Sequence, residues 1–137
     1  MTSAGTTSNI GRGIVSVPSP YSFVDTVARL LSAFTGHGIK VFATIDQRAE
    51  AAAVGLTMPP TTLLLFGNPR AGTPLMVAQP ISGIDLPLKA LVTESVSGEV
   101  LVSFNAATYI LERHSLPAEL LNNLVPAERL IVGALAK

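Results

Sequence analysis

Residues 63–76, Leu-Leu-Leu-Phe-Gly-Asn-Pro-Arg-Ala-Gly-Thr-Pro-Leu-Met, decide how this chain folds around its candidate site. The apolar run that opens the stretch ends at Gly67, which allows a turn. Thr73 followed by Pro74 has the order of an N-cap residue and a first helical residue. The stretch predicts a strand, a loop at residues 68–73, and a helix that begins at Pro74 with the Thr73 hydroxyl as its cap. We expect this loop to line a cleft.

The composition is that of one folded domain that carries few charges. Of 137 residues, 48% are hydrophobic and 13% are charged, with nine cationic and nine acidic side chains. This balance excludes extensive disorder. The chain has no basic run, which argues against a nucleic-acid partner. With so few charges to solvate the surface, we expect a second copy of the chain to cover part of it in a homodimer.

The residues that are missing exclude several kinds of site. Cysteine is absent, which rules out disulfides, thiol catalysis and thiolate metal sites, and two histidines are too few for us to expect a metal centre. No catalytic set and no cofactor can be named from the residue types. No apolar run reaches the roughly 18 residues of a membrane span, and no signal-peptide pattern opens the chain. These features predict a cytoplasmic chain without a membrane span.

Strand signals predict an α+β fold in a single domain at residues 14–137. Residues 1–13 are rich in Ser, Thr and Gly and are expected to form a flexible tail. Strands are predicted at residues 13–17, 39–45, 61–66, 86–95 and 99–104, and the last two form the clearest hairpin. The unbroken apolar run of the third strand predicts burial on both faces or a dimer contact. The expected result is a mainly antiparallel sheet of about five strands with helices packed against it.

Helix signals lie between and after these strands. Ser22 caps a predicted helix, Gln47 opens an alanine-rich one, and Asn105 is expected to cap another that runs to about His114. Residues 80–85 are expected to be a loop. Residues 118–136 have the apolar spacing of a last helix, which Pro126 is expected to divide.

The loop at residues 68–73 is the first candidate binding site. Asn68, Arg70 and Thr73 supply an amide, a guanidinium and a hydroxyl beside the amide groups of a helix N-terminus, which favours anions. The spacing is not that of a nucleotide P-loop or a dinucleotide site. The alternative is a purely structural turn that binds nothing.

A second candidate set consists of Asp46, Lys89 and Glu94, which could supply acid–base groups at strand ends. Asp46 could equally cap the helix that follows it, and Lys89 could be a solvated charge on the sheet. His37 and His114 follow predicted helices, where capping is the simpler role.

The chain resembles the domain-of-unknown-function 302 family over residues 14–116. The residues that carry the resemblance are Phe42-Ala43-Thr44-Ile45-Asp46, Gly55-Leu56, Pro60-Thr61, Phe66-Gly67-Asn68-Pro69, Gly72-Thr73-Pro74-Leu75-Met76 and Leu86-Pro87-Leu88-Lys89-Ala90-Leu91-Val92. The resemblance implies an α+β domain with an antiparallel sheet, usually seen as a dimer, and it implies no established reaction. The chain departs from the family in its longer N-terminal segment and in Ser95-Val96-Ser97, where acidic residues are expected.

Three functional classes stay open at this point. The first is a non-catalytic module that binds a small molecule or lipid, with the loop at residues 68–73 as its polar anchor. The second is a small enzyme that uses Asp46 or Glu94 as general base. The third is a homodimeric interaction domain without a ligand.

Overall fold

Six strands form one sheet in the order β1-β2-β6-β5-β4-β3, and all neighbouring strands are antiparallel. The computed structural model of the chain describes residues 8–9 and 12–137. Five of the strands were predicted, so the α+β fold with a mainly antiparallel sheet is confirmed. The sixth, β1, is a two-residue strand at the edge of the sheet.

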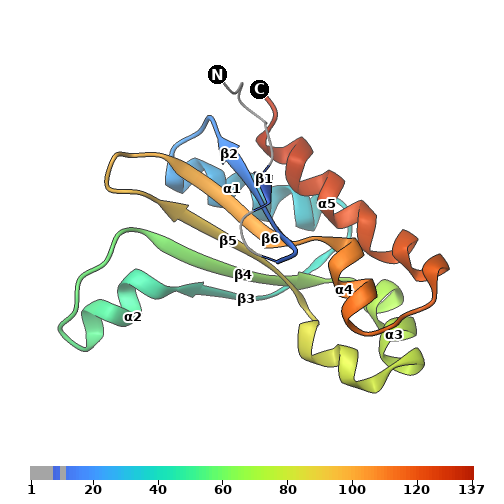
Figure 1. The fold of residues 1–137 in the computed structure, drawn as a ribbon. Coiled ribbons are helices and arrows are strands. Elements are labelled where there is room, and N and C mark those ends of the chain that lie inside the picture. The colour runs from blue at the N-terminus through green and yellow to red at the C-terminus, as the bar shows by residue number, and fades with distance from the viewer. Residues whose placement is uncertain (1–7, 10–11) are drawn as a thin grey trace.

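Helices are interspersed among the strands along the chain (Figure 1). The strands are β1 (Ser8–Asn9), β2 (Ile14–Ser19), β3 (Lys40–Asp46), β4 (Thr61–Gly67), β5 (Leu88–Glu94) and β6 (Val100–Asn105). The α-helices are α1 (Phe23–Gly36), α2 (Gln47–Ala53), α3 (Pro69–Ala78), α4 (Ala107–Arg113) and α5 (Leu121–Leu135). Two 3₁₀-helices, η1 (Pro80–Asp85) and η2 (Ala118–Leu120), join them.

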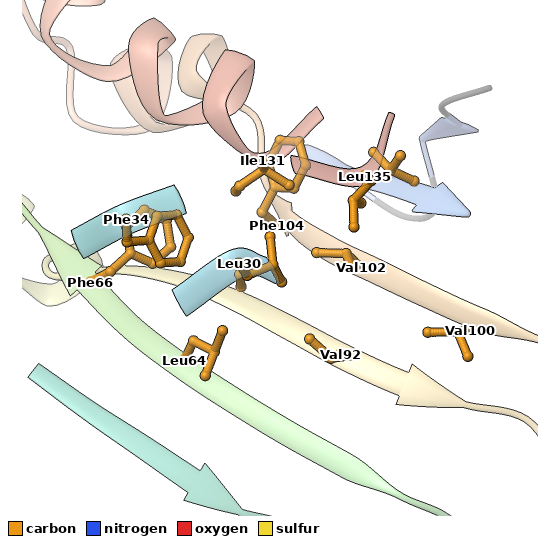
Figure 2. Packing of buried hydrophobic residues seen from close by; sticks show 12 residues of the cluster. Leu30, Phe34, Leu64, Phe66, Val92, Val100, Val102, Phe104, Ile131 and Leu135 are labelled. Carbon is orange, nitrogen blue, oxygen red and sulfur yellow. The ribbon is translucent and has the colours of Figure 1, made fainter. Parts of the chain in front are cut away.

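The main core lies between one face of the sheet and the helices α1 and α5, which also pack on each other (Figure 2). Leu30 of α1 and Leu64 of β4 are fully buried there. The ring of Phe34 stacks on the ring of Phe66 with their centroids 4.1 Å apart and an angle of 14° between the planes. This contact joins α1 to the end of β4, where the chain leaves the sheet.

The opposite face of the sheet carries a row of half-buried apolar side chains. The strand register places Ile45, Leu63 and Leu91 side by side across β3, β4 and β5. The row continues to Ser103 and Ser16, whose hydroxyl oxygens are 2.7 Å apart. Burial therefore alternates along β4, so the expected burial of this strand on both faces is wrong for the single chain.

Local signals located several boundaries correctly. The Ser22 hydroxyl accepts a hydrogen bond from the Asp25 N–H at 3.1 Å, as an N-cap does. The Asp46 carboxylate accepts one from the Ala49 N–H at 2.9 Å, so Asp46 caps α2. His37 is the C-cap residue of α1, and its Nδ1 donates to the Ala33 carbonyl at 2.9 Å. The predicted capping roles of these residues are confirmed.

Proline positions misled the prediction at two places. The first strand was predicted to end at residue 17, before Pro18, but β2 continues to Ser19 and Pro18 pairs with Leu101 inside it. Among the described residues, no strand pairs with the other side of β2 beyond Ser16, so a residue without an N–H is tolerated there. Pro126 does not divide the last helix, because α5 continues through it.

Three further expectations differ from the structure. Residues 80–85 form the 3₁₀-helix η1 rather than a loop, and α4 begins after Ala106 rather than after Asn105. Within the expected tail at residues 1–13, Ser8–Asn9 pairs with β2, while residues 1–7 and 10–11 lie outside the described part of the chain.

The stacked pair gives a stability prediction. Phe34→Ala should lower the free energy of unfolding by about 3–5 kcal/mol, because Phe34 has no exposed surface and its removal leaves a cavity against Phe66. The matched control is Phe42→Ala, since that side chain is 44% exposed and its loss should cost only about 0.5 kcal/mol. Urea denaturation followed by circular dichroism measures both. Equal losses in the two variants would contradict this account of the core.

Candidate functional site

A cavity of about 930 Å³ opens where β4 runs into α3. Its wall comes from the end of α1, β3, the β4–α3 junction, the start of β5 and one side of α5. Most of the lining side chains are apolar: Ile39, Phe42, Phe66, Pro69, Ala71, Met76, Leu86, Pro87, Leu88, Leu124, Pro126, Ala127 and Leu130. The polar ones are His37, Asn68, Arg70, Thr73, Asn122, Asn123 and Arg129. The cavity is therefore an apolar chamber with a minority of polar groups.

The predicted cleft at residues 68–73 is present, but these residues do not form a loop. All six line the cavity, and α3 begins already at Pro69. Asn68 is the N-cap, and its side-chain oxygen accepts a hydrogen bond from the Arg70 N–H at 3.0 Å. The expected cap at Thr73 is wrong, because Asn68-Pro69 gives the same cap–proline signal five residues earlier, and Pro74 lies inside the helix.

The other helical wall of the cavity is α5. Asn122, Pro126 and Arg129 all line the cavity, and their spacing of four and three residues places them on one face of the helix. The Asn123 side-chain amide donates to the Ala71 carbonyl at 3.0 Å, which ties α5 to the first turn of α3.

Both helical walls contain an internal proline. Pro74 and Pro126 cannot donate to the carbonyls of Arg70 and Asn122, four residues earlier in each helix. Since Arg70 and Asn122 both line the cavity, each wall carries a backbone acceptor that lacks its usual intrahelical donor.

A bulge in the edge strand contributes the aromatic part of the wall. The register of β3 against β4 shifts between Val41 and Ala43, and a bulge of this kind re-aims the side chain at its centre. Phe42 stands there, lines the cavity and is 44% exposed. The Lys40 ammonium lies 5.0 Å from the centre of the Phe42 ring, which is a cation–π distance.

The charges that line the cavity are all positive. Arg70 and Arg129 line it, whereas none of its lining residues is Asp or Glu. Among the residues that the structure describes, neither arginine forms a salt bridge. The cavity therefore offers two guanidinium groups without a carboxylate partner from the described chain.

The acidic residues closest in sequence to the cavity wall are already engaged elsewhere. Asp85 precedes Leu86, but its carboxylate accepts from Arg113 Nη1 at 3.1 and 3.2 Å and contacts His114 Nε2 at 2.5 Å. Glu128 precedes Arg129, but its Oε2 accepts from the Ala107 N–H at 2.6 Å. This bond caps α4, which has no capping side chain of its own.

Asp85, Arg113 and His114 form a polar cluster behind the cavity wall, which we call the Asp85 cluster. Asp85 and His114 are only 7% and 8% exposed, and they join the end of η1 to the end of α4. His114 is the C-cap residue of α4, as predicted, and it also meets a carboxylate. The contact fixes the segment that brings Leu86 to the cavity wall. In the part of the chain described, no three His, Asp or Glu side chains gather as metal ligands.

The second candidate set from the sequence is not brought together. Asp46 and Glu94 stand at one end of the sheet, where Glu94 N–H donates to the Pro60 carbonyl. Lys89 lies five residues before Glu94 on β5, which is about 17 Å along a strand. None of the three lines the large cavity, and Lys89 instead borders a separate space of about 20 Å³.

Sequence reasoning found three of the polar cavity residues, Asn68, Arg70 and Thr73, and missed the contribution of α5. Arg129, Asn122 and Asn123 gave no signal, because a polar residue within an amphipathic helix normally faces solvent. Only the packing of α5 on α3 brings them to the cavity.

The family match covers almost the whole described fold. The family model for the domain of unknown function DUF302 matches residues 15–134. The chain belongs to this family. A crystal structure of an uncharacterized conserved DUF302 protein from Bacillus stearothermophilus shares the fold, with a TM-score of 0.76 over 91% of this chain and 97% of that chain. At 17% identity, this DUF302 likeness concerns the fold alone.

Two curated relatives share more of their sequence with this chain than the Bacillus protein does, and both are more than twice as long as the matched segment. The chain is 40% identical over 107 residues to "Fluoride-specific ion channel FluC 1" of Brucella suis biovar 1 (strain 1330), a match that covers 78% of this chain and 42% of that protein. The protein with the same name from Brucella abortus biovar 1 (strain 9-941) matches equally well over 40% of its length. This DUF302 chain thus spans less than half of those relatives. Within its described residues, no helix has the length and apolar character needed to cross a bilayer.

The two candidate caps of α3 can be told apart by mutation. Asn68→Ala should lower the free energy of unfolding by about 1 kcal/mol, because the Arg70 N–H loses its acceptor. Thr73→Ala should change it by only about 0.5 kcal/mol, since Thr73 is exposed and lies inside the helix. Urea denaturation of both variants is the measurement, and a larger loss for Thr73→Ala would contradict the helix start at Pro69.

Proposed function

We propose that this DUF302 domain is a non-catalytic binding module that holds a small, largely apolar molecule in the cavity between α3 and α5. The observation that carries the proposal is the cavity itself. Its volume of about 930 Å³ lies within the range of about 300–1,000 Å³ that is typical of small-molecule sites. Apolar walls with a few polar groups are also typical of such sites, because the walls supply affinity and the polar groups fix orientation.

Within this proposal, Asn68, Arg70 and Thr73 contact the ligand, because all three line the cavity. Asp46, Lys89 and Glu94 are less well placed to do so, since they stand outside its wall. The enzyme alternative depends on Asp46 or Glu94 as general base. A general base must come within hydrogen-bond reach of its substrate, so the position of these carboxylates outside the cavity favours binding over catalysis.

The Brucella relatives suggest where such a module acts. In those proteins a segment similar to this chain makes up about two-fifths of a protein named as a fluoride-specific ion channel. We extend the proposal to a module that binds a small molecule in association with a membrane channel. The cytoplasmic location expected from the sequence belongs to the same proposal.

We also propose that the module is a homodimer, formed through the face of the sheet opposite α1 and α5. Ile45, Leu63 and Leu91 form an apolar row there, and all three remain half-buried in the single chain. Burial of this row against a partner would remove apolar surface from water, which a chain with only 13% charged residues has few charges to offset. A specific dimer would bury more than about 1,000 Å² in total.

Ligand binding can be tested with the uncharged fluorescent probe N-phenyl-1-naphthylamine, which brightens in apolar sites. The full chain should bind the probe, and Gly72→Phe should weaken binding at least about tenfold by filling part of the cavity. Gly72 lines the cavity, and a Cβ there meets only Leu86 Cδ1 at 3.7 Å, so the helix should tolerate the substitution.

The matched control is Gly133→Phe, since Gly133 is also a helical glycine and a Cβ built on it meets nothing within 4 Å beyond its chain neighbours and its own helix backbone. This variant should bind the probe like the unmodified chain. Equal binding by both variants would reject the cavity as the site, and absence of probe binding by the unmodified chain would reject the proposal.

The dimer can be tested by sedimentation equilibrium at tens of micromolar protein. The unmodified chain should sediment at twice its mass of 14.2 kDa, whereas the double variant Leu63→Glu/Leu91→Glu should sediment as a monomer because charges replace the apolar row. The control Val77→Glu places a charge at a 78% exposed position on α3 and should stay dimeric. A monomeric unmodified chain would reject the dimer.

A further inference from the structure

We infer that the ligand of this cavity is an amphipathic organic anion, with its anionic head group between Arg70 and Arg129 and its apolar body against the remaining wall. The inference rests on the proposed function and goes further, because it names the chemical class of the ligand. It depends on three observations: the placement of the two arginines, the absence of acidic groups from the cavity wall, and the apolar character of the rest of the wall.

The two arginines come from two helices that are held together. Arg70 lies in the first turn of α3, and Arg129 lies on the cavity side of α5. The hydrogen bond from Asn123 to the Ala71 carbonyl, next in sequence to Arg70, fixes α5 against the start of α3. The guanidinium groups therefore belong to one cavity with two joined walls, and guanidinium is the side-chain group best suited to grip a carboxylate or phosphate.

The positive charge of the cavity is not compensated within the described chain. Arg70 and Arg129 form no salt bridge with any described residue, and the neighbouring carboxylates of Asp85 and Glu128 are bound to other groups. Lys40, beside the aromatic wall at Phe42, adds a third cation near the cavity. An anionic ligand would supply the missing counter-charge, whereas a cationic one would meet repulsion.

The apolar wall excludes a small inorganic anion as the best occupant. Such an ion would contact the arginines and leave the leucine, proline and phenylalanine side chains of the wall against water. A single-chain amphiphile fits both the charged and the apolar parts of the cavity, because its head group contacts the arginines and its chain covers the apolar wall. We commit to a free, single-chain organic anion rather than to the surface of a membrane.

The test compares three ligands of equal chain length as competitors of N-phenyl-1-naphthylamine on the full chain: dodecanoate, dodecanol and dodecylammonium. The two ions are used below their micelle concentrations and dodecanol below its solubility limit. Dodecanoate should bind about tenfold more tightly than dodecanol, because charge-assisted hydrogen bonds to arginine add to the apolar contact. Dodecylammonium should bind most weakly. The preference for dodecanoate should shrink as sodium chloride is raised, since the arginines are exposed to solvent.

Arg70→Gln and Arg129→Gln should each reduce the affinity for dodecanoate, and the double variant should bring it to the level of dodecanol. The affinity for dodecanol should remain within about twofold of the unmodified value in all of these variants, because the apolar wall is unchanged. Arg48→Gln is the matched control, since Arg48 is an exposed arginine on α2 outside the cavity wall. It should leave the preference for dodecanoate intact.

The outcomes separate this inference from the proposed function. Equal affinity for all three ligands, with binding still lost in Gly72→Phe, would overturn the anionic ligand and keep the binding module. If neither the probe nor any competitor binds the unmodified chain, the proposed function fails together with the inference. Binding to phosphatidylglycerol vesicles without binding of free dodecanoate would overturn the inference in favour of a membrane surface.

Discussion

The stack of Phe34 on Phe66 is the contact on which the position of the cavity depends. Phe66 is the last buried side chain of β4, and it belongs both to the main core and to the cavity wall. Gly67 and Asn68 follow it directly, so burial of the Phe66 ring fixes the place where the chain leaves the sheet and α3 begins. A change in this packing would shift Arg70 and the whole α3 wall, because rigid cores transmit displacements instead of absorbing them.

The sequence predicted the strands and several helix caps because their signals are local. Ser22 and Asp46 each lie three residues before the N–H group that they bind, so neighbouring residues suffice to identify the caps. The start of α3 was misplaced because two cap–proline pairs occur within seven residues, at Asn68-Pro69 and Thr73-Pro74, and local rules cannot choose between them. In the structure the helix begins at the earlier pair, where the Asn68 side chain accepts a hydrogen bond from the Arg70 N–H.

The parts of the site that escaped prediction depend on contacts between distant segments. Arg129 lies 59 positions after Arg70, and Asp85 meets His114 across 29 positions. The cap of α4 comes from Glu128, 21 positions away, rather than from the expected Asn105. Nothing in the local pattern of α5 distinguishes Arg129 from a solvated charge.

The internal prolines of α3 and α5 point to the same cavity from a different direction. A proline inside a helix costs about 3 kcal/mol relative to alanine, so two such residues are a departure from the usual rules of helix composition. Departures of this kind are expected at functional sites, where local stability gives way to the needs of the site. Pro126 lines the cavity, and Pro74 removes the usual intrahelical donor to the carbonyl of Arg70, a residue that also lines it. Both prolines therefore lie in the helical walls that carry Arg70 and Arg129, one of them at the cavity surface itself.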